Sequence, residues 1–334
     1  MEKLLEVSDL HVAFPSKRET VRAVDGVSFQ VFQGETFGLV GESGCGKSVT
    51  ASCIMQLLPE LSRIESGSIT YHSDEGDIRI DQLERNGKKM RSLRGHDMAM
   101  IFQDPMTALN PVYTIGFQIG ENLRYHTKLD KKQRRSKSLK LLMHMGISTP
   151  EKRIDQYPHE FSGGMRQRVM IAMALSCNPR LIIADEPTTA LDVTIQAQIL
   201  DLLRNLKDKI NSSIMLITHD LGVIAEMADY VVVMYAGRVV EKGTAQEIFA
   251  NPAHPYTIGL MASKPMVGKK VDKLYSIPGK VPNPINMPNY CYFKDRCEMC
   301  VEGCQGEYPH MIQLSPTHMV SCYRYYGKED AQNG

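Results

Sequence analysis

The sequence lacks an excess of charge of either sign, and this absence limits the partners that it can have. Its 334 residues include 39 lysines and arginines and 38 aspartates and glutamates, which leaves a formal net charge of +1. A protein whose main partner is a polyanion usually carries a basic surface, so nucleic acid is not favoured. With 43% apolar residues, the chain can bury a large core and has room for one big domain and a smaller one.

Long apolar runs are also missing. No segment of about 20 residues is free of charge, which argues against a membrane-spanning helix. The most apolar stretch, residues 221–240, contains Glu226 and Asp229. The first ten residues carry acidic side chains and no long apolar run, so they do not read as a signal peptide. Internal repeats and long low-complexity tracts are absent too. We expect a soluble, cytoplasmic protein that meets a membrane only through a partner.

Cysteine is unevenly distributed along the chain. Cys45, Cys53 and Cys177 are scattered, whereas the last fifth holds Cys291, Cys297, Cys300, Cys304 and Cys322. Without a secretion signal, clustered cysteines indicate metal ligands before disulfides. The spacing suits a four-thiolate zinc site or an iron–sulfur cluster and does not separate them. Unligated thiols are a third possibility, but so small and apolar-poor a region would then lack an obvious core.

The stretch GESGCGKS, residues 41–48, matches the pattern G-x-x-x-x-G-K-[ST]. In this pattern backbone N–H groups cradle phosphates, a lysine neutralises their charge and a hydroxyl holds magnesium. Residues 35–40 end in the apolar residues of a buried strand, and residues 49–58 have the apolar spacing of a helix. The pattern therefore has the strand, loop and helix context that a phosphate-binding loop requires.

The N-terminal part predicts strands. Apolar patterning indicates strands at residues 4–14 and 21–35 around a polar turn, and we expect them to lie antiparallel beside the phosphate-loop strand. Residues 66–80 indicate short strands around a glycine turn, and residues 98–104 a short apolar strand.

The middle of the chain changes character. Residues 104 to about 160 predict helices joined by turns, with a basic run that we interpret as a solvated helix face. Helices and strands then alternate up to a hairpin at 230–243, which predicts a largely parallel sheet with helices on both faces. The alternation stops at residues 251–255, and a segment rich in Pro, Gly and then Cys follows. We place a boundary to a small, loop-rich domain there.

Polar residues follow three of the predicted strands. After LIIA come Asp185, suited to hold magnesium through water, and Glu186, a candidate base. An ordinary surface acidic pair is the alternative, but four apolar residues leading directly into the pair favour a site. Gln103 follows the strand MAMIF and His219 follows SIMLIT, so both are expected at the same sheet edge.

A second glycine-containing helix start occurs at FSGGMRQR. Ser162, Gly163 and Gly164 precede an apolar-periodic helix, which places a hydroxyl and bare backbone N–H groups where anions bind. An ordinary helix cap is the alternative reading of so short a motif.

Taken in order, these motifs resemble those of the nucleotide-binding subunit of an ATP-binding cassette (ABC) transporter. The similarity implies an α/β fold: a P-loop NTPase cassette at 1–255 with a helical subdomain at about 104–160, and a small Cys-rich C-terminal extension at 256–334. The matching motifs are the phosphate loop, a glutamine loop at Gln103, the signature at 161–165, Asp185 with Glu186, Asp192 within ALD, and His219.

The resemblance implies ATP and Mg²⁺ as ligands. Lys47 would contact the β- and γ-phosphates, Glu186 would polarise the attacking water, and His219 would contact the γ-phosphate. Magnesium would lie near Ser48, Gln103 and Asp185, and the implied catalytic set is Glu186, His219 and Gln103. Phe14 would stack on adenine, although a core phenylalanine is an equally good interpretation. The implied nucleotide-binding set is Phe14, Gly41, Ser43, Gly44, Cys45, Gly46, Lys47, Ser48, Val49, Gln103, Ser162, Gly163, Gly164, Asp185 and Asp192.

The resemblance also implies partners. In this family the signature motif completes the site of a neighbouring cassette, so one chain is half of an active pair. The implied partners are a second ATPase subunit, expected to be a related chain in a heterodimer, and two transmembrane permease subunits. An extracytoplasmic peptide-binding protein would act indirectly, and the chain would lie at the cytoplasmic face of the cell membrane.

One branch of the family is resembled in particular. Met165 replaces a common glutamine, and FSGGMRQRVMIAMAL, FQDPMTALNPVYTIGFQI and HPYTIGLMASKP are similar to ATPase subunits of oligopeptide and dipeptide importers. An importer for nickel or another small solute is the first alternative. A soluble cassette protein acting on nucleic acid or ribosomes is the second, but such proteins usually carry two cassettes or a long coiled-coil insertion.

The C-terminal cysteines resemble that branch as well. The motif CYFKDRC, followed by Cys304 and Cys322, is similar to its C-x-F-x-x-R-C pattern. The resemblance implies a [4Fe-4S] cluster on Cys291, Cys297, Cys304 and Cys322, with Cys300 as a spare thiol and zinc as the alternative.

Overall fold

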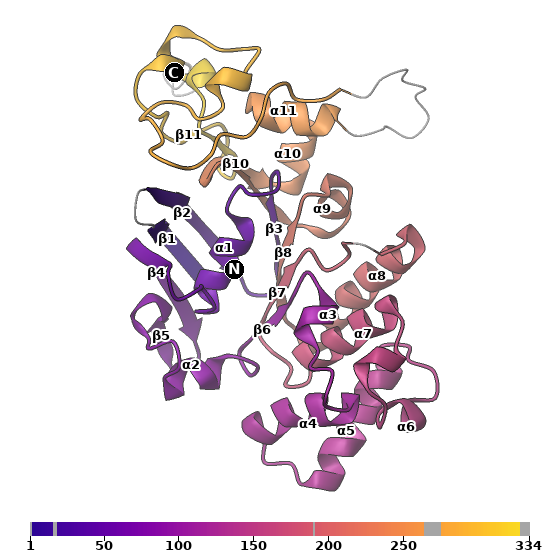
Figure 1. Ribbon diagram of the computed structural model, residues 1–334. Coiled ribbons are helices and arrows are strands. Elements are labelled where there is room, and N and C mark those ends of the chain that lie inside the picture. Colours follow the sequence, from indigo (N-terminus) through magenta and orange to yellow (C-terminus); the bar gives the residue numbers. More distant parts are fainter. Residues whose placement is uncertain (1, 16–18, 190, 264–274, 328–334) are drawn as a thin grey trace. The chain divides into compact units, whose positions relative to one another are not determined.

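The computed structural model describes residues 2–15, 19–189, 191–263 and 275–327 (Figure 1). The chain divides into two units that each combine distant segments. The first unit comprises Met1–Leu4, Val31–Thr36 and Gln82–Ile217, and the second comprises Leu5–Gln30, Phe37–Asp81 and Thr218–Gly334. Residues 16–18 of the predicted turn at 15–20, and the alanine of the ALD motif, lie outside the described residues.

The first unit contains three parallel strands in the order β8-β7-β6: β6 (Met98–Ile101), β7 (Leu181–Asp185) and β8 (Ser213–Thr218). Ile101 is paired with Ala184, and Asp185 with Ile217, so the strands end at one edge. Every residue of β7 and β8 is buried, as expected for continuous apolar runs in a parallel sheet.

Helices make up the rest of the first unit. Thr114 caps α4 by accepting the N–H of Phe117, and Asp130 forms a capping box with Gln133 at the start of α5. Only Ser138 and Leu142 of α5 are buried, which confirms that its basic run is a solvated face. The helices are α2 (Lys88–Leu93), α3 (Pro105–Ala108), α4 (Ile115–His126), α5 (Lys131–His144), α6 (Pro150–Arg153), α7 (Gly163–Ala174) and α8 (Val193–Ile210).

The second unit contains the strand that leads into the phosphate loop. This strand, β3 (Thr36–Val40), lies parallel to β9 (Tyr230–Tyr235), which forms the predicted hairpin with β10 (Arg238–Thr244). β12 (Met319–Val320) pairs with β10, and β11 (Ile312–Gln313) pairs with β12. The C-terminal segment thus extends the same sheet as the hairpin.

The remaining strands of the second unit form another sheet in the order β2-β1-β4-β5. They are β1 (Lys3–Pro15), β2 (Thr20–Phe32), β4 (Arg63–Ser73) and β5 (Gly76–Arg79). The prediction that the first two strands lie beside the phosphate-loop strand was therefore wrong. β1 pairs antiparallel with β4 and mixes buried with exposed residues, whereas β3 is buried throughout and has a parallel neighbour.

The helices of the second unit are short: α1 (Lys47–Ile54), α9 (Leu221–Met227), α10 (Ala245–Ala250) and α11 (Pro255–Ala262). α11 begins at the position of the predicted boundary, where the His254 imidazole accepts the N–H of Tyr256. Within the described residues, no helix combines the length and apolarity needed to cross a membrane.

Candidate functional site

The phosphate loop connects β3 to α1 in the second unit, and its glycines are required by its backbone. Gly41 has a φ of 151° and Gly46 a φ of 101°. A Cβ at Gly46 would collide with the carbonyl oxygen of Ala23, and one at Gly41 with that of Met234. Only glycine avoids both the unfavourable φ and the collision. The loop is thus held tightly against its surroundings.

Lys47 lies across this loop. Its Nζ donates to the carbonyl oxygens of Gly41 and Glu42, at 2.7 Å and 3.1 Å. The lysine is buried, while Ser43, Gly44 and Ser48 are exposed. One positive charge is therefore fixed against a loop whose backbone remains open to a ligand.

A cavity of about 480 Å³ lies beside the loop. His219, which is exposed and directly follows β8, lines this cavity. The structure thus brings the predicted histidine and the phosphate loop to one space. The other residues around it are Gly41, Glu42, Ser43, Leu221, Leu260, Ser263, Tyr275, Ser276 and Ile277.

The acidic strand end forms a second cluster, in the first unit. Gln103 donates from Nε2 to the Glu186 carboxylate at 3.0 Å, and the Thr189 hydroxyl donates to the same oxygen at 2.8 Å. The Glu186 N–H donates to Ile217 at 2.8 Å. Gln103 therefore lies at the sheet edge where the sequence placed it, in contact with Glu186, and Asp185 is buried at the last position of β7. Thr189 was missed, because a threonine in a turn has no distinguishing pattern.

Glu186 is also conformationally unusual. Its φ of 46° lies in the left-handed region, which costs a non-glycine residue about 1 kcal/mol or more. Such strain is often found where a side chain must be held in a functional direction.

The signature motif forms the start of α7. The Ser162 Oγ accepts the N–H of Met165 at 3.4 Å, and Ser162 and Gly163 are exposed. Farther along the helix, Gln167 donates to the Pro187 carbonyl at 2.6 Å, which ties α7 to the segment after Glu186. Asp192 is exposed at the N-cap position of α8.

The other predicted nucleotide contacts are in the second unit. Cys45 is buried, with its Sγ 3.7 Å from the Lys47 Nζ. Val49 is half-buried in the first turn of α1, and Phe14 is half-buried near the end of β1. Stacking of Phe14 on adenine stays a prediction.

Two residues of the C-terminal part of the second unit contact the loop without any sequence pattern that indicates it. Arg296 forms two hydrogen bonds with the Glu42 carboxylate, and the Tyr256 hydroxyl accepts the Glu42 N–H. Arg296 lies in the cysteine motif CYFKDRC, and no local pattern connects it with a loop 254 residues away.

The C-terminal cysteines differ in exposure. Cys291, Cys304 and Cys322 are buried, Cys297 is half-buried and Cys300 is exposed. Burial, and to a smaller extent the charges of Cys304, Cys322 and Cys297, raises the pKa of Cys291 to about 12. Within the described part of the chain, however, no three or more His, Cys, Asp or Glu side chains converge as ligands of a metal ion.

A glycine-rich loop between a buried parallel strand and a helix defines a nucleotide-binding protein of the P-loop class. Two family models match this chain. One, described as ABC transporter, matches residues 24–189. The other, described as oligopeptide/dipeptide transporter, C-terminal region, matches residues 240–304.

Curated relatives are similar over almost the whole chain. The dipeptide transport ATP-binding protein DppD of Bacillus subtilis is 50% identical over 97% of this chain and 95% of its own. The oligopeptide transport ATP-binding protein AppD of the same organism is 49% identical over 97% and 98%. DppD of Haemophilus influenzae is 48% identical over 96% and 95%. The chain belongs to the ABC transporter family as one of its ATPase subunits.

Solved structures agree on the fold. The ATP-binding cassette MJ0796, in a dimeric state bound to ADP and phosphate, has a TM-score of 0.64 at 24% identity and covers 72% of this chain and 99% of its own. The cbiO1 protein of Clostridium perfringens, part of an ABC transporter complex, has a TM-score of 0.62 at 27% identity, covering 75% and 92%. The predicted α/β cassette fold is confirmed.

Proposed function

We propose that this chain is the ATP-hydrolysing subunit that drives an importer of dipeptides and oligopeptides. The observation that carries the proposal is the joint presence of a phosphate loop and a C-terminal region that matches the oligopeptide/dipeptide transporter model. The relatives named for dipeptide and oligopeptide transport are similar across both parts. We also keep the domain boundary at residue 255 and the helical subdomain at about 104–160 as proposals.

The loop residues would hold the triphosphate. The Lys47 ammonium would exchange the carbonyls of Gly41 and Glu42 for β- and γ-phosphate oxygens, while exposed N–H groups of the loop bind the remaining oxygens. His219 lines the adjoining cavity and would contact the γ-phosphate. Mg²⁺ would neutralise charge on the transferred phosphoryl group. Ser48, Gln103 and Asp185 carry the oxygen atoms suited to hold it.

Glu186 would orient and polarise the attacking water. Its carboxylate is oriented by the hydrogen bonds from Gln103 and Thr189. Glu186→Gln should leave ATP binding intact and lower turnover by about 10²- to 10⁴-fold, the usual contribution of a general base. Exposed Glu151, on α6, supplies the matched control Glu151→Gln, which should change neither. Unchanged hydrolysis in Glu186→Gln would remove the residue from this role.

A second cassette would complete the site. Ser162 and Gly163 form an exposed helix start, the type of end that binds anions. We therefore place them over the ATP of a neighbouring ATPase subunit, with a related chain as the heterodimer partner.

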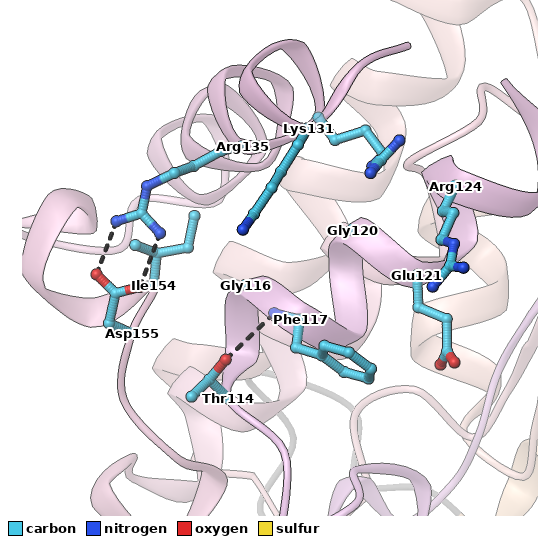
Figure 2. Close-up of a pocket in the computed structure, with 11 residues that line it drawn as sticks. Thr114, Gly116, Phe117, Gly120, Glu121, Arg124, Lys131, Arg135, Ile154 and Asp155 are labelled. Atoms are coloured by element: carbon cyan, nitrogen blue, oxygen red, sulfur yellow. Dashed lines mark hydrogen bonds and ion pairs between the residues drawn. The ribbon is translucent and has the colours of Figure 1, made fainter. Parts of the chain in front are cut away.

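The permease contact is proposed for the helical subdomain. A cavity of about 440 Å³ is lined by residues of α4 and α5, and Figure 2 shows Gly116 and Gly120 on its α4 side. Nearby Tyr113 and Phe117 are exposed and stack with ring centroids 4.5 Å apart, and Val112 is 69% exposed. Exposed apolar patches of this kind mark interaction sites. Through this surface the chain would attach to the cytoplasmic face of the membrane.

A [4Fe-4S] cluster on Cys291, Cys297, Cys304 and Cys322 is proposed, with zinc as the alternative. The support is burial: Cys291, Cys304 and Cys322 are buried and Cys297 is half-buried, and a bound cation would offset the cost of burying their thiolates. Protein purified without oxygen should contain iron and inorganic sulfide. Cys304→Ser should lose both, while the control Cys300→Ser should keep them. Stoichiometric zinc without iron would overturn the cluster.

The cargo is tested on the complex isolated from membranes in mild detergent. We expect a second ATPase and two permease subunits to copurify, and ATP hydrolysis to rise when di- and oligopeptides and the binding protein are added. Stimulation by Ni²⁺ but not by peptides would favour the nickel importer. Copurifying RNA without membrane subunits would favour the soluble cassette protein.

A further inference from the structure

A residue of the cysteine-bearing segment is paired with the phosphate loop. The guanidinium of Arg296 donates from Nη1 to Glu42 Oε2 at 2.7 Å and from Nη2 to Glu42 Oε1 at 3.1 Å. Two parallel hydrogen bonds of this kind fix both distance and direction. Glu42 is the second residue of GESGCGKS, so the pair reaches the loop itself.

Arg296 is firmly held from its own side. Only 6% of its side chain is exposed, and its Nε donates to the Pro278 carbonyl at 2.8 Å. Burial alone would lower the pKa of Arg296, but its hydrogen bonds to Glu42 and Tyr235 raise the pKa above its usual value, so the charge is retained. The guanidinium also lies near the rings of Tyr235 and Phe293.

The same segment supports a second contact to the loop. The Tyr256 hydroxyl accepts the backbone N–H of Glu42 at 2.7 Å. Phe293, three residues before Arg296, packs against both Tyr256 and Tyr235, with ring centroids 5.5 Å and 5.2 Å apart. The backbone and the side chain of Glu42 are therefore both fixed by residues of the C-terminal part.

The charge of Glu42 matters for an anionic ligand. Glu42 lines the cavity beside the loop, together with Ser43 and His219. An unpaired carboxylate there would repel a triphosphate, because like charges at close range in a partly buried site are poorly screened. Arg296 is the partner that neutralises this carboxylate.

We propose that Arg296 is a positioning residue of the phosphate loop: by neutralising Glu42 and fixing its direction, it makes the affinity of the loop for a nucleoside triphosphate depend on the cysteine-bearing segment 291–297. The proposal rests on nucleotide binding at this loop, which belongs to the proposed function. It adds that a C-terminal residue, far from the loop in sequence, sets how well that loop binds.

The test is equilibrium binding of a fluorescent ATP analogue to the full chain. Arg296→Ala should weaken binding about tenfold, within the range of coupling between contacting charged groups. Glu42→Gln alone should change affinity less than about threefold, because the amide still accepts from Arg296 and carries no charge. The double variant Arg296→Ala/Glu42→Gln should regain most of the lost affinity, since the repelling carboxylate is gone.

The matched control is Lys294→Ala. This lysine lies in the same short helix, Lys294–Arg296, and its ammonium is over the Tyr290 ring rather than at the loop. Its removal should leave nucleotide affinity unchanged. If Arg296→Ala does not fold, judged by circular dichroism, Arg296→Lys replaces it. The lysine keeps the charge but loses the paired geometry, so about threefold weaker binding is expected.

Two results would overturn the inference: unchanged affinity in the folded Arg296 variant, or a loss that Glu42→Gln does not restore, as a purely structural role would give. Failure of the wild-type chain to bind ATP would contradict the proposed function instead. Turnover at saturating ATP in the assembled complex supplies the second readout. It should stay within about threefold of wild type in Arg296→Lys while KM for ATP rises, because the residue acts on binding.

Discussion

The starts of α1 and α7 both contain glycine and are both suited to anions, but they are built differently. The loop before α1 is held by other parts of the chain: Gly46 lies against Ala23, and Glu42 is fixed by Arg296. At the start of α7, Ser162 and Gly163 are exposed, and a Cβ added at Gly163 would meet none of the described atoms within 4 Å.

This structural difference indicates a different role for the start of α1 and the start of α7. A helix start that is preorganised by its own chain is ready to bind phosphate before anything else arrives. An exposed helix start has anion-binding capacity without a wall to enclose the ligand. We interpret the first as the nucleotide site of this subunit and the second as half of a site completed by another subunit.

The largest effect is expected at the α1 end. Lys47→Ala should weaken ATP binding by the isolated chain about 100-fold, since it removes hydrogen bonds from a charged donor to phosphate worth about 3 kcal/mol. Isothermal titration with ATP measures it. A loss below about threefold would show that the packed loop does not depend on its lysine.

A charge introduced at the start of α7 should distinguish the roles of the two helix starts. Gly163→Asp places a carboxylate at the exposed helix start and should lower turnover of the assembled complex at least about tenfold, because in the proposed pair it would face the phosphates bound by the neighbouring subunit. ATP affinity of the isolated chain should stay unchanged. Weaker binding by that isolated chain would contradict the assignment of the signature to a neighbour's ATP.

A smaller effect on turnover is expected from removing a hydrogen bond that orients the Glu186 carboxylate. Thr189→Val removes a side-chain hydrogen bond to Glu186 and should lower turnover about fivefold, the value of one neutral hydrogen bond. ATP affinity should be the same as in wild type. Steady-state kinetics of the complex measure both, and a changed KM with constant kcat would place Thr189 in nucleotide binding instead.

The smallest predicted effect is a pH-dependent loss of folding stability through His254, whose imidazole accepts the N–H of Tyr256. Burial lowers the pKa of His254 to about 4, and the Glu241 charge opposes this only in part. The folded pKa lies below the unfolded value of 6.5, so the unfolded chain binds the extra proton first. Stability is therefore complete above pH 6.5 and is lost as the pH falls towards 4.

The measurement is the melting temperature between pH 6.5 and 5.5. Wild type should lose about 3 °C more than His254→Asn, which keeps an acceptor for the Tyr256 N–H but does not titrate. Equal losses in the two proteins would show that His254 does not contribute. Tyr256 contacts Glu42 in the phosphate loop. The affinity of this loop for ATP is therefore expected to fall over the same pH range, with no corresponding effect at the start of α7.

Local patterns predicted most of the elements and the motif positions. The strand, loop and helix around residues 36–54 and the contact between Gln103 and Glu186 follow from apolar runs and from the edge shared by parallel strands. The placement of β1 and β2 was wrong, because alternation shows that a strand is half-buried but does not identify its neighbours. Arg296 and Thr189 were missed because no local pattern connects either residue with the glutamate that it contacts.

The central claim is that this chain binds ATP alone but hydrolyses it only when another cassette covers the bound nucleotide. Its most direct test is ATP turnover per chain, measured while the second ATPase subunit of the complex is titrated in. The account predicts ATP binding without appreciable turnover at the start, and turnover that rises and saturates at one partner per chain. Full turnover by the isolated monomer, independent of the partner and of protein concentration, would contradict it.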